Sequence, residues 1–309
     1  MSRLAIIEPK TLMGEAVREA IASRASVWDQ IELFTTDSEE VGRVTEVADR
    51  AAIVQSLEDD TLDAFDAVLF CHREIDLGVW KSVPGHCQAI FIDPETPLAD
   101  AVPAVAGINS EHLAGSTRLV SPAPGVLLLA HLLAPLRELG DLEVIAHVLQ
   151  PASVHDKAGL DELFGQTRAI LSMSDQRPEE VFGTQLAFNL LPWPGSSAPL
   201  SSHLQTILGT TWEARIHLSQ AGVFHCCSAG IFLSVENDPG AAELQDLLLE
   251  NPLVERPENP ELLGPVAAAT KDKILIGELT SSPVKGYWLW SCMDNLAFSA
   301  SNALALAQP

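Results

Sequence analysis

The chain has 309 residues, of which 42 are acidic and 18 are basic, so its formal net charge is −24. Hydrophobic residues make up 47% of the chain, which excludes a disordered protein and allows a large core spread over about two domains. The acidic excess argues against binding to nucleic acid or to an anionic membrane surface, because both need clustered Lys and Arg.

The sequence shows no pattern typical of a membrane span, a signal peptide or a disulfide framework. The longest apolar run, residues 126–134, contains His131 and is far shorter than the ~20 residues that a membrane helix needs. Near the N-terminus, Glu8 and Pro9 interrupt the apolar stretch that a signal peptide requires. The five cysteines lack CxxC spacing, so we expect free thiols, no bound metal and a cytoplasmic location.

Short, continuously apolar runs predict the strands of the N-terminal part of the chain. They cover residues 4–7, 31–34, 66–71 and 89–93. Strands without alternation are buried on both faces, so we expect a parallel sheet with helices on either side. After the first run, apolar residues at 13, 16, 17, 20 and 21 have helical spacing. The segment is therefore predicted to be a doubly wound domain of the nucleotide-binding type.

From Pro124 onward the pattern changes to an aliphatic helix followed by more polar, alternating strands. The helix is expected over residues 126–136, and Ser153 and Asp156 are expected to cap a second, amphipathic helix. Strands are predicted over residues 142–149, 214–218, 230–235, 273–279 and 288–292, with a last helix over 295–307. The alternation predicts a mixed or antiparallel sheet that is open on one face.

Four stretches stand out in order along the chain. They are residues 150–163, Ala187-Phe-Asn-Leu-Leu-Pro192, residues 222–228, and Asp294-Asn-Leu296 followed by Ala300-Ser-Asn302. As an ordered set they resemble the aspartate-semialdehyde dehydrogenase family, and the resemblance covers essentially the whole chain. It implies a Rossmann-like parallel-sheet domain over residues 1–123 and 296–309 and an α+β dimerisation domain over residues 124–295. It also implies a homodimer and a phosphorylating, NAD(P)-dependent oxidoreductase of amino-acid biosynthesis.

The position of the family's nucleophile departs from this pattern. In the family a Cys just before a helix attacks the aldehyde, and the corresponding residue here is Pro124. A shift of the alignment by one or two residues supplies no thiol, because no Cys lies between residues 87 and 226. The nearest hydroxyl belongs to Ser121, and a serine without a base is a poor nucleophile.

The base and the substrate contacts of the family differ as well. The family's base, a His, corresponds to Cys227, with His225 two residues away. Residues i and i+2 of a strand share a face, so His225 and Cys227 form the fallback pair of base and nucleophile. The family's substrate-binding Arg corresponds to Gln220, which can hydrogen-bond a carboxylate but supplies no charge. Gln150 and Ser153 are further cleft candidates, although both could equally satisfy buried backbone groups.

The cofactor loop keeps one of the family's three glycines. Where the family has G-x-x-G-x-x-G, this chain reads Glu8-Pro-Lys-Thr-Leu-Met-Gly14, so Gly14 is the one remaining cofactor-binding candidate. Glu8 places a carboxylate where a diphosphate would sit. The family recognises the 2′-phosphate of NADP in the next loop, where Glu39 and Glu40 would repel it, although Asp37 could hold a plain ribose. We therefore expect no cofactor.

Together these departures predict a catalytically inactive homologue, or pseudoenzyme, with a structural or regulatory role. We expect a homodimer, and a heterodimer with an active relative is a second option. The alternative is an NAD(P)-dependent semialdehyde dehydrogenase with an altered active site, which would bind NADP or NAD and use His225 and Cys227. Trp193, Trp288 and Trp290 are assigned to the core or to the dimer interface rather than to a ligand platform.

Overall fold

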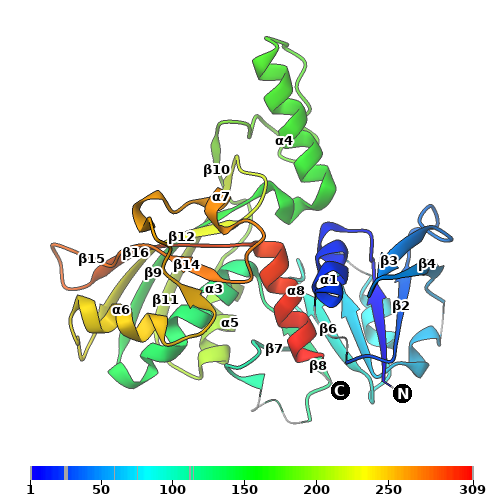
Figure 1. Ribbon diagram of the computed structural model, residues 1–309, viewed down its shortest axis with the longest axis horizontal. Coiled ribbons are helices and arrows are strands. Elements are labelled where there is room, and N and C mark those ends of the chain that lie inside the picture. Colours follow the sequence, from blue (N-terminus) through cyan, green and yellow to red (C-terminus); the bar gives the residue numbers. More distant parts are fainter. Residues whose placement is uncertain are drawn as a thin grey trace. The chain divides into compact units, whose positions relative to one another are not determined.

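The structure, a computed structural model, describes residues 2–23, 27–58, 60–74, 76–110, 113 and 115–307. It divides into two compact units, one formed by residues 1–123 and 299–309 and the other by residues 124–298 (Figure 1). Each unit is built on one sheet, and each sheet has eight strands among the described residues. No helix in the described ranges is long and apolar enough to cross a membrane.

The first unit contains a sheet of the order β3-β4-β2-β1-β5-β6-β8-β7. Its strands are β1 (Arg3–Ile7), β2 (Gln30–Thr35), β3 (Val44–Val47), β4 (Arg50–Ser56), β5 (Ala67–Phe70), β6 (Gln88–Ile92), β7 (Val102–Pro103) and β8 (Arg118–Ser121). Neighbouring strands are parallel except in the β3–β4 hairpin. The four predicted apolar strands and their parallel pairing are thus confirmed. The sequence did not predict the other four strands: β3, β7 and β8 lack a continuous apolar run of four residues, and the short apolar run of β4 was not selected.

Helices cover both faces of this first sheet. On one face, α1 (Leu12–Ala22) and the second half of α8 (Asn295–Leu306) share a buried apolar cluster with β1. On the other face, Trp80 of α2 (Leu77–Ser82) contacts the rings of Phe70 and Phe91. Strand β1 lies between β2 and β5. The order of the strands along the chain runs outward from β1 in one direction to β2 and β4, and later in the other direction from β5. In such doubly wound sheets ligands bind outside the carboxyl ends of the strands at this switch point.

The second unit contains a mixed sheet of the order β10-β11-β9-β12-β16-β14-β13, with β15 paired to β16. Its strands are β9 (Leu142–Gln150), β10 (Leu190–Pro192), β11 (Glu213–Ala221), β12 (Cys227–Val235), β13 (Val254–Glu255), β14 (Ile274–Ile276), β15 (Thr280–Ser281) and β16 (Tyr287–Met293). The pairs β9–β11 and β13–β14 are parallel and the others are antiparallel. The predicted mixed sheet is confirmed, although the strand expected over residues 273–279 is limited to β14.

One face of the second sheet is covered and the other is open, as its alternation predicts. Helices α3 (Pro124–Leu133), α5 (Ala198–Leu208) and α6 (Ala241–Leu249) belong to this unit, and α3 and α5 pack on the face that carries Val144. The open face carries half-exposed Ile145, Trp288 and Trp290. Helix α3 starts two residues earlier than predicted and continues as a 3₁₀ helix over Ala134–Leu139.

Helix α4 (Asp156–Leu171) stands out from the second sheet in Figure 1 and holds the A-F-N-L-L-P stretch through buried polar side chains. Gln166 Oε1 accepts hydrogen bonds from the amides of Leu186 (2.7 Å) and Ala187 (3.0 Å). Its Nε2 donates to the carbonyls of Pro178 and Thr184. Side-chain hydrogen bonds made within the chain therefore place this stretch, which carries the strongest resemblance.

The expected cap of α4 is wrong, whereas the expected start of α8 is confirmed. Ser153 lies in a 3₁₀ turn, Ala152–His155, and its hydroxyl lies 3.3 Å from Asn295 Oδ1 instead of capping α4. Asp294 Oδ1 accepts from the amides of Leu296 and Ala297 at 3.0 Å, which is the geometry of a helix N-cap.

We expect Gln166→Leu to destabilise the protein by about 3 kcal/mol or more. Two amides and two carbonyls lose their partner, and each buried polar group left unsatisfied costs about 1–3 kcal/mol. Chemical denaturation followed by fluorescence measures the free energy of unfolding. Gln176→Leu is the matched control, because Gln176 is exposed and its loss should cost less than about 0.5 kcal/mol. Equal effects of the two substitutions would contradict this account of the network.

Candidate functional site

The loop after β1 is the first part of the candidate site, because it lies at the carboxyl edge of the parallel sheet. Glu8 has a φ of +59°, in the left-handed region that favours glycine. Thr11 caps α1, since its Oγ1 accepts from the Gly14 amide at 3.0 Å. The same hydroxyl lies 2.8 Å from the Cys71 carbonyl oxygen at the end of β5. The loop is thus tied to both the helix and the neighbouring strand.

Gly14, the predicted cofactor glycine, has a packing function in this loop. A Cβ atom at this position would lie 2.4 Å from the Glu8 carbonyl oxygen and 2.6 Å from the carbonyl carbon of Pro9. Such distances are far below van der Waals contact, so α1 can approach its own loop only with glycine here. Close packing by itself explains this residue.

The Glu8 carboxylate binds the end of β2. Its Oε2 accepts from Thr35 Oγ1 at 2.7 Å, and its Oε1 accepts from the Thr36 amide and the Thr36 hydroxyl, each at 2.8 Å. In the following turn, Asp37 Oδ1 accepts from the Glu39 amide, and Glu40 forms a 3.0 Å ion pair with Arg43. This geometry does not fit a dinucleotide phosphate, because a carboxylate already occupies the donors at this strand end.

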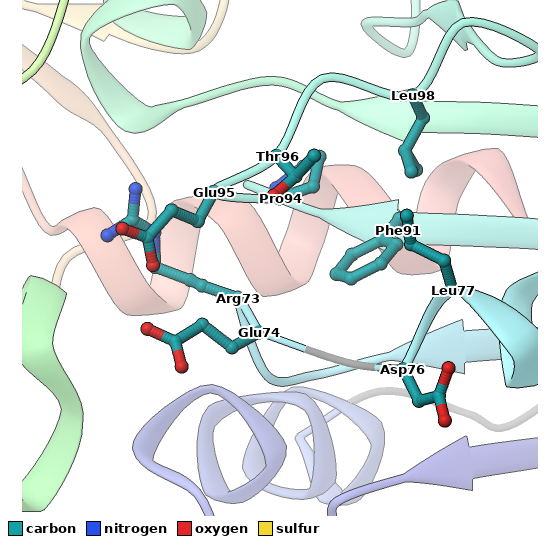
Figure 2. A pocket seen from close by; sticks show the side chains of 9 residues that line it. All are labelled: Arg73, Glu74, Asp76, Leu77, Phe91, Pro94, Glu95, Thr96 and Leu98. Atoms are coloured by element: carbon teal, nitrogen blue, oxygen red, sulfur yellow. The ribbon is translucent and has the colours of Figure 1, made fainter.

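A cavity of about 480 Å³ lies beside the carboxyl ends of β5 and β6. In Figure 2, Phe91, Leu77 and Leu98 form its apolar part, and the carboxylates of Glu74, Asp76 and Glu95 line it. Its one cation, Arg73, lies 3.0 Å from Asp93 Oδ2 and also donates to the Asp93 carbonyl oxygen. The sequence analysis missed this ion pair, although Asp93 ends one predicted strand and Arg73 lies two residues after another. An acidic lining with a paired guanidinium disfavours an anionic ligand.

In the second unit, Pro124, which the resemblance places at the nucleophile position, begins a helix. Pro124 is buried and is the first residue of α3. Proline suits this position because its missing N–H would have no intrahelical partner and its φ is preset for a helix. Ser121, the nearest hydroxyl in sequence, belongs to the first unit and is fully buried. It accepts a 2.9 Å hydrogen bond from Asn302 Nδ2, so it anchors α8.

The three predicted cleft residues belong to two polar clusters near the ends of β9 and β11. Gln150 and Gln220 belong to the first cluster and Ser153 to the second. Gln150 and Gln220 are directly opposite in the parallel register, and Gln220 Nε2 donates to the Gln150 carbonyl oxygen at 3.0 Å. Gln220 Oε1 lies 3.0 Å from His155 Nε2, and the His155 ring lies 5.7 Å from that of Trp193. Gln150 Oε1 is buried without a hydrogen-bond partner in the structure. The sequence analysis did not select His155.

Ser153 belongs to the second cluster, which Asn295 organises. The Asn295 Nδ2 donates to Ser153 Oγ at 3.1 Å, and its Oδ1 accepts from the Cys226 amide at 2.9 Å. These contacts join the 3₁₀ turn before α4, the segment before β12 and the start of α8. Ser153 therefore satisfies buried polar groups. This is the second of the two roles that the sequence allowed for it, the first being a contact to a ligand in the cleft.

The strand geometry assumed for His225 and Cys227 is wrong. Strand β12 begins at Cys227, and His225 lies in a bend before it. Between them Cys226 has a φ of +75°, so the alternation of a strand does not apply to this segment. Cys227 itself is fully buried. Within the described ranges, no group of three or more His, Cys, Asp or Glu side chains could hold a metal ion.

The thiols lie in environments that disfavour the thiolate. The five cysteines are thiols that form no disulfide, and all are buried. Burial raises the pKa of Cys226 to about 12, with the nearby Asp294 carboxylate adding to the effect. Burial likewise raises the pKa of Cys87 to about 12 and raises the pKa values of Cys71 and Cys292. An activated catalytic cysteine shows the opposite shift, toward a pKa below that of free cysteine.

Comparison with known proteins agrees with the fold. Residues 133–298 match the family model described as semialdehyde dehydrogenase, dimerisation domain. The aspartate-semialdehyde dehydrogenase of Rickettsia conorii is 23% identical over 329 residues, which cover 99% of this chain and 96% of that protein. The USG-1 protein homolog of Azotobacter vinelandii is 29% identical over 202 residues, covering 63% of this chain and 59% of that protein. The structure of aspartate semialdehyde dehydrogenase II from Vibrio cholerae, complexed with ASA, superposes with a TM-score of 0.89 at 21% identity and covers 100% of this chain and 97% of that one.

We expect the native protein to react very slowly with a thiol reagent such as Ellman's reagent at pH 8. With a pKa of about 12, only about one Cys226 thiol in 10⁴ is ionised at that pH, and burial limits access further. All five cysteines should react once the protein is denatured, and absorbance measures the count. Rapid labelling of Cys227 in the native protein, located by mass spectrometry, would contradict this expectation and would favour the His225–Cys227 enzyme.

Proposed function

Because this chain belongs to the semialdehyde dehydrogenase family, we propose that it is a catalytically inactive homologue of aspartate-semialdehyde dehydrogenase with a structural or regulatory role. The observation that carries the proposal is that Pro124, which the resemblance matches to the family's nucleophile, is the buried first residue of α3. A proline offers neither a nucleophilic atom nor an N–H group.

Other parts of the second unit support the same proposal. Cys227, at the position of the family's base, is a fully buried thiol and cannot act as an imidazole does. Gln220, at the position of the substrate-binding Arg, uses its amide on Gln150 and His155. The groups of a catalytic unit depend on one another, and loss of the nucleophile alone lowers kcat by roughly 10⁶-fold in a well-studied protease. The family's reaction therefore lacks its essential groups in this chain.

We expect the purified protein to show no phosphate-dependent reduction of NADP or NAD by aspartate semialdehyde. Its kcat should be below about 10⁻⁴ of that of an active relative, because Pro124 supplies no thiol at the position that the resemblance gives to the nucleophile. The near-ultraviolet absorbance of the reduced cofactor measures the rate, and the active relative is assayed in parallel. Turnover that is lost in Cys227→Ala but kept in Cys292→Ala would overturn the proposal and establish an enzyme with a displaced nucleophile.

The open face of the second sheet supports a homodimer as the working form. Trp288 is 48% exposed and Trp290 is 36% exposed, and both lie on β16. The Trp288 ring lies 5.2 Å from that of Phe232 on β12, and Ile145 on β9 is 39% exposed. Aromatic side chains of this kind are enriched at interfaces, and the matching family model is a dimerisation domain. The second option is a heterodimer, in which the same face would pack against a similar face of an active relative.

We expect Trp288→Glu to convert the dimer into a monomer. A carboxylate buried at the centre of an aromatic interface is not paired, so its desolvation would weaken association by several kcal/mol. Sedimentation velocity at micromolar concentration measures the molar mass. Val44→Glu is the matched control, because Val44 is an exposed apolar residue on β3 of the first unit. A monomeric wild type, or a Trp288→Glu protein that stays dimeric, would contradict the assignment of this face.

A further inference from the structure

The structure points to Glu8 as an internal ligand: we infer that its carboxylate occupies hydrogen-bond donors at the end of β2 that would otherwise bind the 2′-phosphate of an adenine nucleotide. The inference concerns the first unit alone and does not depend on whether the second unit is catalytically inactive. The ligand class that this edge of the sheet would take is a 2′-phosphorylated adenine nucleotide, and the side chain that excludes it is Glu8.

The location in the fold supplies the first step. Strands β1 and β2 are parallel neighbours, with Ile7 opposite Phe34, so Glu8 and Thr35 follow at the same edge of the sheet. In doubly wound sheets, the residues at the end of the second strand recognise the adenosine ribose and a phosphate attached to its 2′ oxygen. Thr35 and Thr36 lie at that place in the fold.

The donors themselves supply the second step. Two hydroxyls and one backbone amide converge on the Glu8 carboxylate at 2.7–2.8 Å, the short distances that are typical of hydrogen bonds to an anion. Hydroxyls and amides of this kind bind phosphate oxygens as readily as carboxylate oxygens. A phosphate could use the same donors only after the carboxylate had left.

The backbone of Glu8 shows that the carboxylate is held in place. Its φ of +59° is unfavourable for a residue with a side chain, and glycine would adopt it without strain. The Glu8 amide donates to the Phe34 carbonyl oxygen at 2.8 Å, which fixes the start of the side chain beside β2. The three hydrogen bonds to the carboxylate offset the strained backbone, so the side chain has a defined position rather than a solvated one.

The neighbouring acidic residues do not account for the exclusion of phosphate by themselves. Glu40 is neutralised by Arg43 at 3.0 Å, and Asp37 accepts from the Glu39 amide within the turn. Glu39 is exposed and adds one negative charge to the same loop. Replacing Glu8 therefore leaves three donors available and removes one negative charge. Replacing the Glu39 carboxylate removes one negative charge and leaves those donors bound to Glu8.

Calorimetric titration of the full-length protein with adenosine 2′,5′-bisphosphate tests the inference. We expect Glu8→Gly to bind this nucleotide at least about tenfold more tightly than the wild type, because charge-assisted donors become available. Glu39→Gln, the matched charge control, should change the affinity by less than about threefold. Adenosine 5′-monophosphate should show no gain with Glu8→Gly, which separates the 2′-phosphate from other parts of the nucleotide.

Two further measurements keep the test decisive. Thermal melting checks that Glu8→Gly is folded, and Glu8→Asn serves as a second variant because asparagine tolerates a positive φ and is too short to reach both threonines. In either variant, hydrogen exchange of the Thr36 amide should accelerate relative to the wild type. A folded variant that fails to gain 2′-phosphate binding, or a Glu39→Gln protein that gains as much, would overturn the inference. Absence of dehydrogenase activity would leave it unaffected.

Discussion

Polar groups at the carboxyl ends of parallel strands need hydrogen-bond partners, and in this protein the chain itself supplies most of those partners. Glu8 satisfies Thr35 and Thr36 at the end of β2. Asn302 satisfies Ser121 at the end of β8. A buried polar group without a hydrogen-bond partner lowers the stability of the fold. In a ligand site, the ligand normally supplies that partner. Here side chains of the same unit take that place, so the strand ends contribute contacts to the stable fold.

The second unit follows the same rule at the end of β9. Gln220 binds the Gln150 carbonyl oxygen and approaches His155, while Asn295 joins Ser153 to the segment before β12. These contacts are made between uncharged or weakly basic groups, whereas the family pairs a substrate carboxylate with an Arg. One exception is Gln150 Oε1, which is buried and has no partner among the described residues. The polar groups at this strand end thus meet through neutral hydrogen bonds.

The stretches that resemble the family contain residues that hold the fold together. The A-F-N-L-L-P stretch is held by Gln166 of α4, Asp294 caps α8, and Asn302 fixes the last helix in the first unit. Each of these side chains makes a contact that holds the fold together. The retained Gly14 is explained in the same way by the close approach of α1 to its own loop. The stretches that resemble the family are therefore explained in this chain by packing and capping.

The sequence by itself determined four buried parallel strands of the first sheet, the helices that become α1, α3, α4 and α8, and the mixed second sheet. Those features depend on local composition and periodicity, which the chain displays directly. Only the tertiary structure decided which polar groups meet, because Glu8 and Thr35 lie 27 residues apart and Asn302 and Ser121 lie 181 apart. It also showed that His225 precedes β12, since the positive φ of Cys226 interrupts the alternation that the sequence suggested. Backbone conformation at single residues and contacts across long sequence separations are set by packing, which periodicity does not encode.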